Sequence, residues 1–142
     1  MHRFEVDPAI VAVTTPLGAL KLCDALLIDD ARFPWIVLVP RRMGARELEH
    51  LAVADRALLM EEIVAAGAAV RAIGAGRGRP VLKLNAGALG NITAQLHLHV
   101  VGRREDDPCW PGPVWRCGSA EAYGAAALAE AVQIARGALG LG

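Results

Sequence analysis

The sequence lacks an excess of charge of either sign. Its 142 residues include 15 lysines and arginines and 15 aspartates and glutamates, so the formal net charge is zero at pH 7. No overall field therefore draws the chain to nucleic acid or to an acidic membrane surface, and an anionic ligand must be held by local groups. We expect neither nucleic acid nor a membrane among its partners.

Long apolar runs are also missing. No run approaches the roughly 18 residues of a membrane-spanning helix. The first residues, MHRFEVDPAIV, have neither the basic nor the apolar region of a signal peptide. The length is that of one ordinary domain. We therefore expect a single cytoplasmic domain that covers residues 1–142.

Cysteine is scarce. The three cysteines, Cys23, Cys109 and Cys117, are odd in number and show no C-x-x-C spacing of the kind found in zinc or redox sites. Buried or idle thiols are therefore expected, in preference to metal ligands or disulfides.

The first half of the chain contains two segments typical of strands. Residues 19–29 (ALKLCDALLID) end at paired aspartates, and residues 33–42 (FPWIVLVPRR) are rich in β-branched residues and bounded by prolines. The polar residues 29–32 between them suit a hairpin connection. We expect these two segments to form an antiparallel pair.

From about Asp55 the spacing becomes helical. Apolar residues recur at steps of four and three on one face, namely Leu59, Ile63, Ala66, Val70 and Ile73. The polar residues Arg56, Glu62 and Arg71 fall off that face. Residues 74–76 (GAG) supply a stop, because glycine tolerates the left-handed conformation that ends helices. This helix is expected to cover one side of the sheet.

The second half adds strands and a terminal helix. Residues 81–87 and 93–103 are typical of strands, residues 106–115 are irregular because of their prolines, and an alanine-rich stretch near the C-terminus predicts a helix. Tryptophans in a proline-rich segment, here Trp110 and Trp115, more often fix that segment to the body than close over a ligand base. Short connections between strands, with helices collected elsewhere, predict an α+β fold with an antiparallel sheet.

The segment TAQLHLHVVGR, residues 93–103, alternates polar and apolar side chains. In a strand, Gln95, His97 and His99 share one face, because successive side chains point to opposite faces. Antiparallel sheets often expose one polar face, but such faces usually carry Lys, Glu, Thr or Ser. Imidazoles and an amide are better suited to directional hydrogen bonds, which favours a chemical role.

Two chemistries use a pair of histidines two residues apart on a strand. One is metal binding, but His2 and His50 lie in unrelated segments and no acidic residue shares the strand to supply a further ligand. The other is nucleophilic catalysis at phosphorus, in which one imidazole nitrogen attacks while a neighbour fixes the tautomer. The ligand count favours catalysis, and we expect no metal.

The motif QLHLHVV resembles that of the histidine triad (HIT) family, H-φ-H-φ-H-φ-φ with φ apolar, with glutamine replacing the first histidine. The flanks are similar as well: LIDDARFPWIVLVPRR resembles the family's hairpin, KLNAGALGN its asparagine-then-glycine segment, and WPGPVW a tail found in several members. The resemblance covers roughly residues 15–115 and fits best a bacterial branch with the motif form Q-x-H-x-H.

The resemblance implies roles for individual residues. His97 would attack the α-phosphorus of a nucleotide substrate and form a transient nucleotidyl-histidine, and His99 would contact the phosphoryl group. Asp29, or Asp30 next to it, would bind the ribose hydroxyls. Three positions would cradle the phosphate through backbone N–H groups and an amide side chain: Asn85, Gly90 and Asn91.

The resemblance also implies an architecture and partners. It implies a roughly five-stranded antiparallel sheet with a long covering helix and a C-terminal helix. The activity would be that of a nucleotide hydrolase or nucleotidylyl transferase that needs no cofactor. The partners would be a purine nucleotide or nucleotide conjugate and a second copy of the chain, because many members form a homodimer with a continuous sheet.

Gln95 occupies the first position of the motif as a third catalytic residue. An amide can orient His97 through hydrogen bonds, but it has no accessible pKa and cannot shuttle a proton. We therefore expect a preference for pyrophosphate-type or mixed-anhydride bonds, whose leaving groups depart as stable anions, over phosphoramidates. The alternative is a nucleotide-binding dimeric module with little or no turnover.

Overall fold

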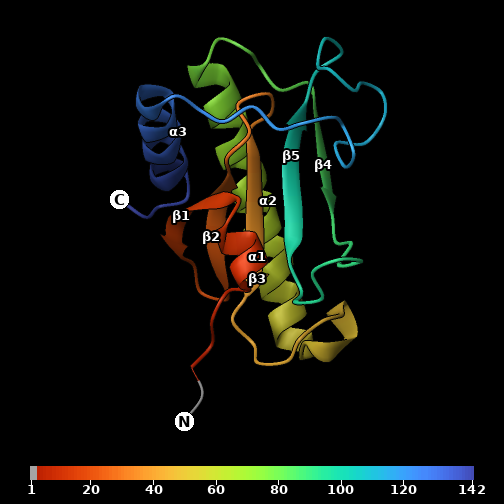
Figure 1. The fold of residues 1–142 in the computed structure, drawn as a ribbon. Helices are drawn as coiled ribbons and strands as arrows, with labels where there is room; N and C mark the ends of the chain where they lie inside the picture. The colour runs from red at the N-terminus through yellow and green to blue at the C-terminus, as the bar shows by residue number, and fades with distance from the viewer. Residues whose placement is uncertain (1–2) are drawn as a thin grey trace.

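The computed structural model describes residues 3–142 and contains a five-stranded antiparallel sheet with strand order β1-β2-β3-β5-β4 (Figure 1). This confirms the predicted α+β fold. The strands are β1 (Thr14–Ala19), β2 (Cys23–Ile28), β3 (Trp35–Pro40), β4 (Lys83–Gly87) and β5 (Leu98–Arg103). The helices are α1 (Pro8–Val11), the 3-10 turn η1 (Leu48–His50), α2 (Val53–Gly76) and α3 (Ala125–Ala138).

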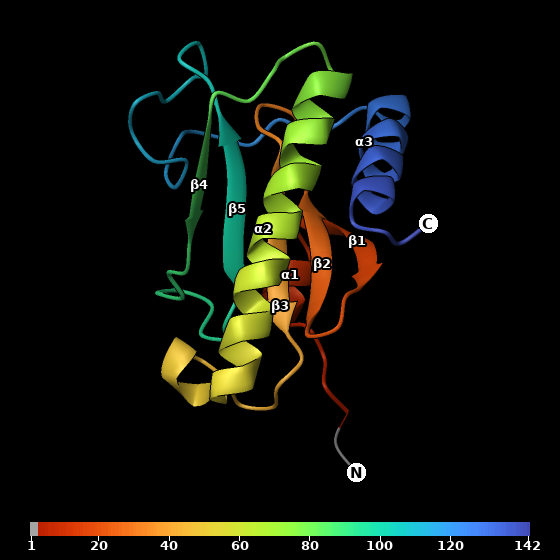
Figure 2. The same cartoon turned by 180° about the vertical axis from the view of Figure 1, so that it is seen from behind.

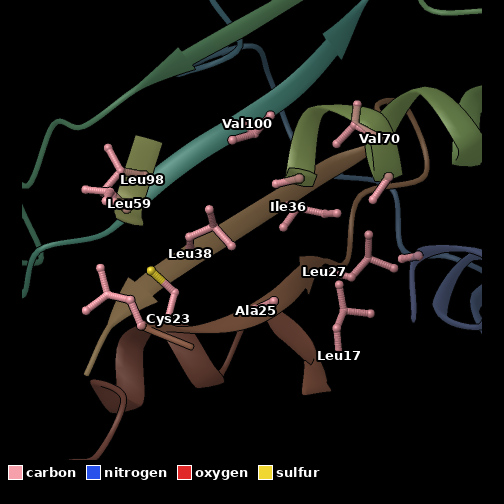
Figure 3. Packing of buried hydrophobic residues seen from close by; sticks show 14 of the residues in the cluster. Leu17, Cys23, Ala25, Leu27, Ile36, Leu38, Leu59, Val70, Leu98 and Val100 are labelled. Carbon is pink, nitrogen blue, oxygen red and sulfur yellow. The ribbon is translucent and has the colours of Figure 1, made fainter. Parts of the chain in front are cut away.

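Helix α2 lies along one face of the sheet, where it forms the larger apolar core (Figure 2). Alternate residues of the strands point toward it, among them Ile36 of β3 and Val100 of β5, and they meet Leu59 and Val70 of the helix (Figure 3). The predicted helical face is confirmed, since its residues are buried or half-buried. Burial of the larger apolar side chains, such as Leu59 and Val70, stabilises the packing of the helix on the sheet by about 1.5–3 kcal/mol each.

The opposite face of the sheet carries a smaller apolar cluster. It is covered by α1 and by the connection between β5 and α3, which crosses the sheet on the side away from α2 (Figure 1). Val37 and Val101 of the sheet meet Ile10 of α1 and Val114 of the connection. This face is where the two motif histidines lie, because their strand alternates between the two clusters.

The N-terminal strands differ from the expectation. The pairing of residues 23–28 with residues 35–40 is antiparallel, as predicted. The single strand predicted for residues 19–29 is wrong, however, because the chain turns at residues 20–22 and a separate strand, β1, precedes the turn. Pro16 and Gly18 weaken the strand signal of β1, and the register shifts between them as at a β-bulge.

Glu62 of α2 is buried, although the helical spacing placed it off the apolar face. Its carboxylate accepts hydrogen bonds from the backbone N–H groups of Leu22 and Cys23, at 2.9 Å each. A buried carboxylate is tolerated because both oxygens are bonded. Glu62 therefore fixes the turn between β1 and β2 to the helix.

The predicted strand at residues 93–103 is shorter than expected, since β5 begins at Leu98. The residues before it bond to other segments: the backbone N–H of Leu96 donates to the carbonyl of Ala45, and the side chain of Gln95 bonds to the N-terminal segment. These contacts keep residues 93–97 out of a regular strand ladder.

The expectation of idle thiols is wrong for two cysteines. Cys109 and Cys117 form a disulfide with a Cα–Cα distance of 5.9 Å, while Cys23 is free and buried as expected.

The connection between β5 and α3 is held by this disulfide and also by Arg103. The guanidinium of Arg103 donates to both carboxylate oxygens of Asp107, at 2.7 and 3.0 Å, in a buried ion pair. Residues 104–124 thus follow a fixed path without regular secondary structure.

Within residues 3–142, the structure contains no helix that combines the length and the apolar character needed to cross a membrane.

The disulfide should contribute measurably to stability. Replacing Cys109 and Cys117 together by serine is expected to lower the free energy of unfolding by about 2–3 kcal/mol, because the bond closes a short loop in the unfolded chain. Intact mass after denaturing alkylation checks the bond directly: we expect one alkyl group without reductant, on Cys23, and further labelling of Cys109 and Cys117 only after reduction. Labelling of all the cysteines without reductant would contradict the assignment.

Candidate functional site

A cavity of about 510 Å³ lies beside the start of β5, and its wall includes His97 and His99. Apolar parts of the wall come from Ile28 at the end of β2, Trp35 at the start of β3 and Trp115 in the connection after β5. The volume is typical of a small-molecule site. His97, just before β5, and His99, within it, therefore both reach a cavity large enough for a ligand.

His97 is buried and its ring orientation is fixed by the backbone. Its Nδ1 lies 2.6 Å from the carbonyl oxygen of Gln95. A carbonyl oxygen only accepts hydrogen bonds, so Nδ1 must carry the proton. In the neutral ring, Nε2 then has a free lone pair, which is the form that a nucleophile requires.

His99 lies on β5 opposite Val37 of β3. Its Nδ1 accepts a hydrogen bond of 3.0 Å from the indole N–H of Trp35. Its ring centroid is 5.0 Å from that of His97 and 5.4 Å from that of Trp115, both in edge-to-face arrangements. Burial, together with the nearby His97, lowers the pKa of His99 to about 4, so this ring is neutral at pH 7.

Gln95 has a different role from the one expected. Its side-chain amide donates to the carbonyl of Glu5 at 2.8 Å and accepts from the N–H of Asp7 at 2.7 Å. The amide therefore makes one donated and one accepted hydrogen bond with the backbone of the N-terminal segment, as a peptide group of a neighbouring strand would. The group of Gln95 that orients His97 is its backbone carbonyl, which any residue at this position supplies.

The two aspartates after β2 differ in their surroundings. Asp29 accepts a hydrogen bond from the backbone N–H of Tyr123 at 2.9 Å and is not part of the cavity wall. Asp30 lines the cavity and binds Arg32 through both carboxylate oxygens, at 2.8 and 3.0 Å. Burial alone would raise the pKa of Asp30, but hydrogen bonds from Arg32 lower it below its usual value.

The predicted phosphate-binding residues are divided by the structure. Gly90 and Asn91 line the cavity, and Gly90 has a positive φ of 75°, which glycine adopts without strain. Asn85 lies on β4 outside the cavity wall, and its side-chain oxygen accepts from Arg103 at 3.0 Å. The structure therefore brings Gly90 and Asn91, but not Asn85, to the histidines.

A second cavity, of about 380 Å³, adjoins the first at His97 and Gly90. Its wall carries charges of both signs, from Arg46, Glu47 and Glu49 in the segment between β3 and α2. Because the two cavities share the side chain of His97, a ligand group bound at that ring can extend to either side of it.

Sequence reasoning did not assign Arg32 and Trp35 to the site. Trp35 is two positions before Val37, which pairs with His99, so its place on the histidine face follows once the register of β3 and β5 is known. Trp115, which the sequence predicts to fix the proline-rich segment to the body, packs on the smaller apolar cluster and also lines the cavity.

Among residues 3–142, no group of three or more His, Cys, Asp or Glu side chains is placed to hold a metal ion.

Comparison with known proteins gives concordant results. The HIT domain family model matches residues 12–106. A histidine triad protein of Bradyrhizobium japonicum has a similar structure, with a TM-score of 0.90 and 34% identity over 97% of this chain and 99% of its own. A histidine triad protein of Sinorhizobium meliloti has a TM-score of 0.88 and 38% identity, with 96% and 97% coverage. No curated protein matches this chain.

The family match over residues 12–106 and the similarity of nearly full length to these bacterial structures lead to one conclusion: the chain belongs to the histidine triad family.

Proposed function

We propose that this protein binds a purine nucleotide derivative and cleaves it at the α-phosphate through a covalent bond to His97. Membership of the histidine triad family supports a nucleotide-binding function of this type. The observation that carries the proposal is the hydrogen bond from Nδ1 of His97 to the backbone carbonyl of Gln95, which leaves Nε2 unprotonated in a side chain that lines the cavity.

The reaction has two displacement steps. In the first, the Nε2 lone pair of His97 forms a bond to the α-phosphorus, and the bond from phosphorus to the leaving group breaks with both electrons on the leaving group. In the second, a water or another acceptor attacks the same phosphorus, loses its proton to solvent, and releases the histidine. The covalent intermediate divides one difficult displacement into two easier ones.

The other polar residues supply binding and orientation. Asp30, which lines the cavity, is better placed than Asp29 for the ribose hydroxyls, and Gly90 and Asn91 are placed for the phosphate. Asn85 lies outside the cavity wall, so it has no direct part in the proposed phosphate site. The apolar wall formed by Ile28 and the tryptophans suits a nucleobase, because a base is a flat aromatic group.

The preferred leaving group depends on which side chains of the site could protonate it. The amide of Gln95 has no accessible pKa and is engaged by Glu5 and Asp7, and His99 is neutral because its pKa is lowered to about 4 by burial and by His97. Neither residue therefore protonates a leaving group at pH 7. Bonds of the pyrophosphate or mixed-anhydride type are favoured, since their leaving groups are stable anions.

The covalent step is tested by mass spectrometry. Mixing the protein with an adenosine polyphosphate, followed by a denaturing quench without acid, is expected to give a mass increment of one nucleotidyl group. His97→Ala should abolish the increment, because the attacking nitrogen is removed. His50→Ala is the matched control, since it also removes an imidazole but His50 lines neither of the two cavities beside His97.

The leaving-group preference is tested by kinetics at pH 7. We expect kcat/KM for an adenosine polyphosphate to exceed that for adenosine phosphoramidate by a factor on the order of 10²–10⁴, the usual contribution of general acid catalysis. The amine leaving group needs a proton that the site does not supply. Equal kcat/KM values for the two substrates would show that some group does protonate the leaving nitrogen.

A binding module without turnover is the second candidate function. It is favoured by the side chain of Gln95, which bonds the N-terminal segment instead of a reacting group. This function predicts nucleotide monophosphate binding by calorimetry with no mass increment on His97. The two experiments together therefore separate an enzyme from a module.

We also infer that the protein forms a homodimer through α2 and β4. Strand β4 is at the edge of the sheet, and its Leu84 reaches α2 at Gly67. The outer side of α2 exposes Met60 and Val64 at adjacent turns. A second copy would pair with the edge strand and cover these side chains.

The dimer is tested by light scattering after size exclusion. Val64→Glu is expected to give a monomer, because it places a charge in the apolar interface. Met43→Glu is the matched control, since the side chains of Met43 and Val64 are 63% and 62% exposed but Met43 lies in the loop after β3. A dimer that persists in Val64→Glu, or a monomeric parent protein, would exclude this interface.

A further inference from the structure

The two histidines of the site are held at the same ring atom by opposite kinds of group. Nδ1 of His97 faces the carbonyl oxygen of Gln95 at 2.6 Å, and Nδ1 of His99 faces the indole N–H of Trp35 at 3.0 Å. A carbonyl only accepts a hydrogen bond and an indole N–H only donates one. The neutral rings must therefore carry their protons on different nitrogens: Nδ1 in His97 and Nε2 in His99.

We propose that Trp35 is a positioning residue that locks His99 in its Nε2–H tautomer, so that the site presents a hydrogen-bond donor beside the nucleophilic nitrogen of His97. The part of this proposal that concerns the tautomer stands on geometry alone. The part that concerns a phosphoryl oxygen as the acceptor rests on the proposed function.

The position of the indole N–H is fixed by the sheet. Trp35 pairs with Val101 in the antiparallel register of β3 and β5, which makes it the diagonal neighbour of His99 on the same face. Its ring is buried and packs edge-on against Phe33, with centroids 6.3 Å apart and planes at 83°. A donor held by both strand register and packing needs no reordering when a ligand binds.

The same hydrogen bond resists protonation of His99. A proton added at Nδ1 would face the indole N–H and break the bond, and burial adds a desolvation penalty for the charged ring. The other titratable or charged groups of the cavity wall are His97, Asp30, Arg32 and Arg116. Asp30 is paired with Arg32, so its negative charge is compensated and does not favour protonation of His99.

Trp115 provides an internal comparison. Its ring also packs edge-on against His99, at 5.4 Å and 77°, yet its Nε1 has no hydrogen-bond partner within the described residues. Both tryptophans therefore contribute apolar contact to His99, but only Trp35 contributes a hydrogen bond to it. Removing the N–H of one or the other separates the two contributions.

A neutral Nε2–H has a specific chemical consequence. It can donate a hydrogen bond to a nonbridging phosphoryl oxygen and stabilise charge that develops there in the displacement. It has no spare proton to release near pH 7, because its loss would leave an imidazolate. His99 would thus act by positioning and electrostatic stabilisation, and its contribution would not change with pH across the neutral range.

The experiment is long-range 1H–15N correlation of the imidazole nitrogens in uniformly labelled protein without ligand. In the parent protein we expect a protonated Nε2 and a bare Nδ1 for His99, unchanged from pH 8 to about pH 5, because the pKa of this ring is lowered to about 4 by burial and by His97. At pH 8 we expect the reverse tautomer for His97. In Trp35→Phe, which keeps an aromatic ring but lacks the N–H, His99 should show mixed tautomers, because no donor then holds Nδ1 as an acceptor. Its pKa should be higher than in the parent protein but still below the ordinary value of about 6.5, since burial and His97 are unchanged. The control Trp115→Phe should keep the parent pattern.

Several outcomes overturn the proposal. A protonated Nδ1 on His99 of the parent protein does so without any variant, so the test remains decisive even where Trp35→Phe fails to fold. An unchanged tautomer in Trp35→Phe, or equal changes in the two tryptophan variants, would assign the effect to ring packing instead.

Kinetics then tests the link to catalysis. Trp35→Phe is expected to lower kcat on the order of 10-fold with a smaller change in KM, as is usual when a hydrogen bond to a residue that contacts the substrate is lost. The acid limb of its kcat profile is expected to lie at higher pH than in the parent protein. A kcat profile of Trp35→Phe that matches the parent's would overturn the catalytic part of the proposal. If the parent protein itself turns over no nucleotide, the proposed function fails, while the tautomer measurement still decides the role of Trp35.

Discussion

The pairing of β5 between β3 and β4 is the constraint on which both the core and the site depend. In this register Val100 points toward α2 and His99 points to the opposite face, beside Trp35. A slip of one residue would exchange the two faces and bury the imidazoles in hydrocarbon. The packing energy of the core therefore also selects the arrangement of the site, and the two cannot vary independently.

The elements that could be predicted are those whose pattern is local. Residues 35–40 and α2 have an apolar composition or spacing that fixes one structure, and the alternation in residues 96–101 placed His97 and His99 on one face. Strand β1 escaped prediction because Pro16 and Gly18 interrupt its pattern. Glu62 was misplaced because its partners, in the turn after β1 and at the start of β2, are 39 and 40 residues away in sequence.

Gln95 shows why the rest of the site could not be predicted. The type of a residue determines which hydrogen bonds its side chain can make. Its actual partner depends on which other segment of the chain folds next to it. The amide of Gln95 meets Glu5 and Asp7, 90 and 88 residues away, so it holds the N-terminal segment. The ring of His97 is oriented by a backbone carbonyl two residues before it, a contact that survives any substitution at the first motif position.

The connection after β5 has several independent anchors. One of them is the disulfide between Cys109 and Cys117. The wall formed by Trp115 does not rest on that bond alone. The buried pair of Arg103 with Asp107 and the hydrogen bond from Arg32 to the carbonyl of Cys117 hold the same segment. Reduction would therefore loosen the cavity wall without removing the contacts that define its position.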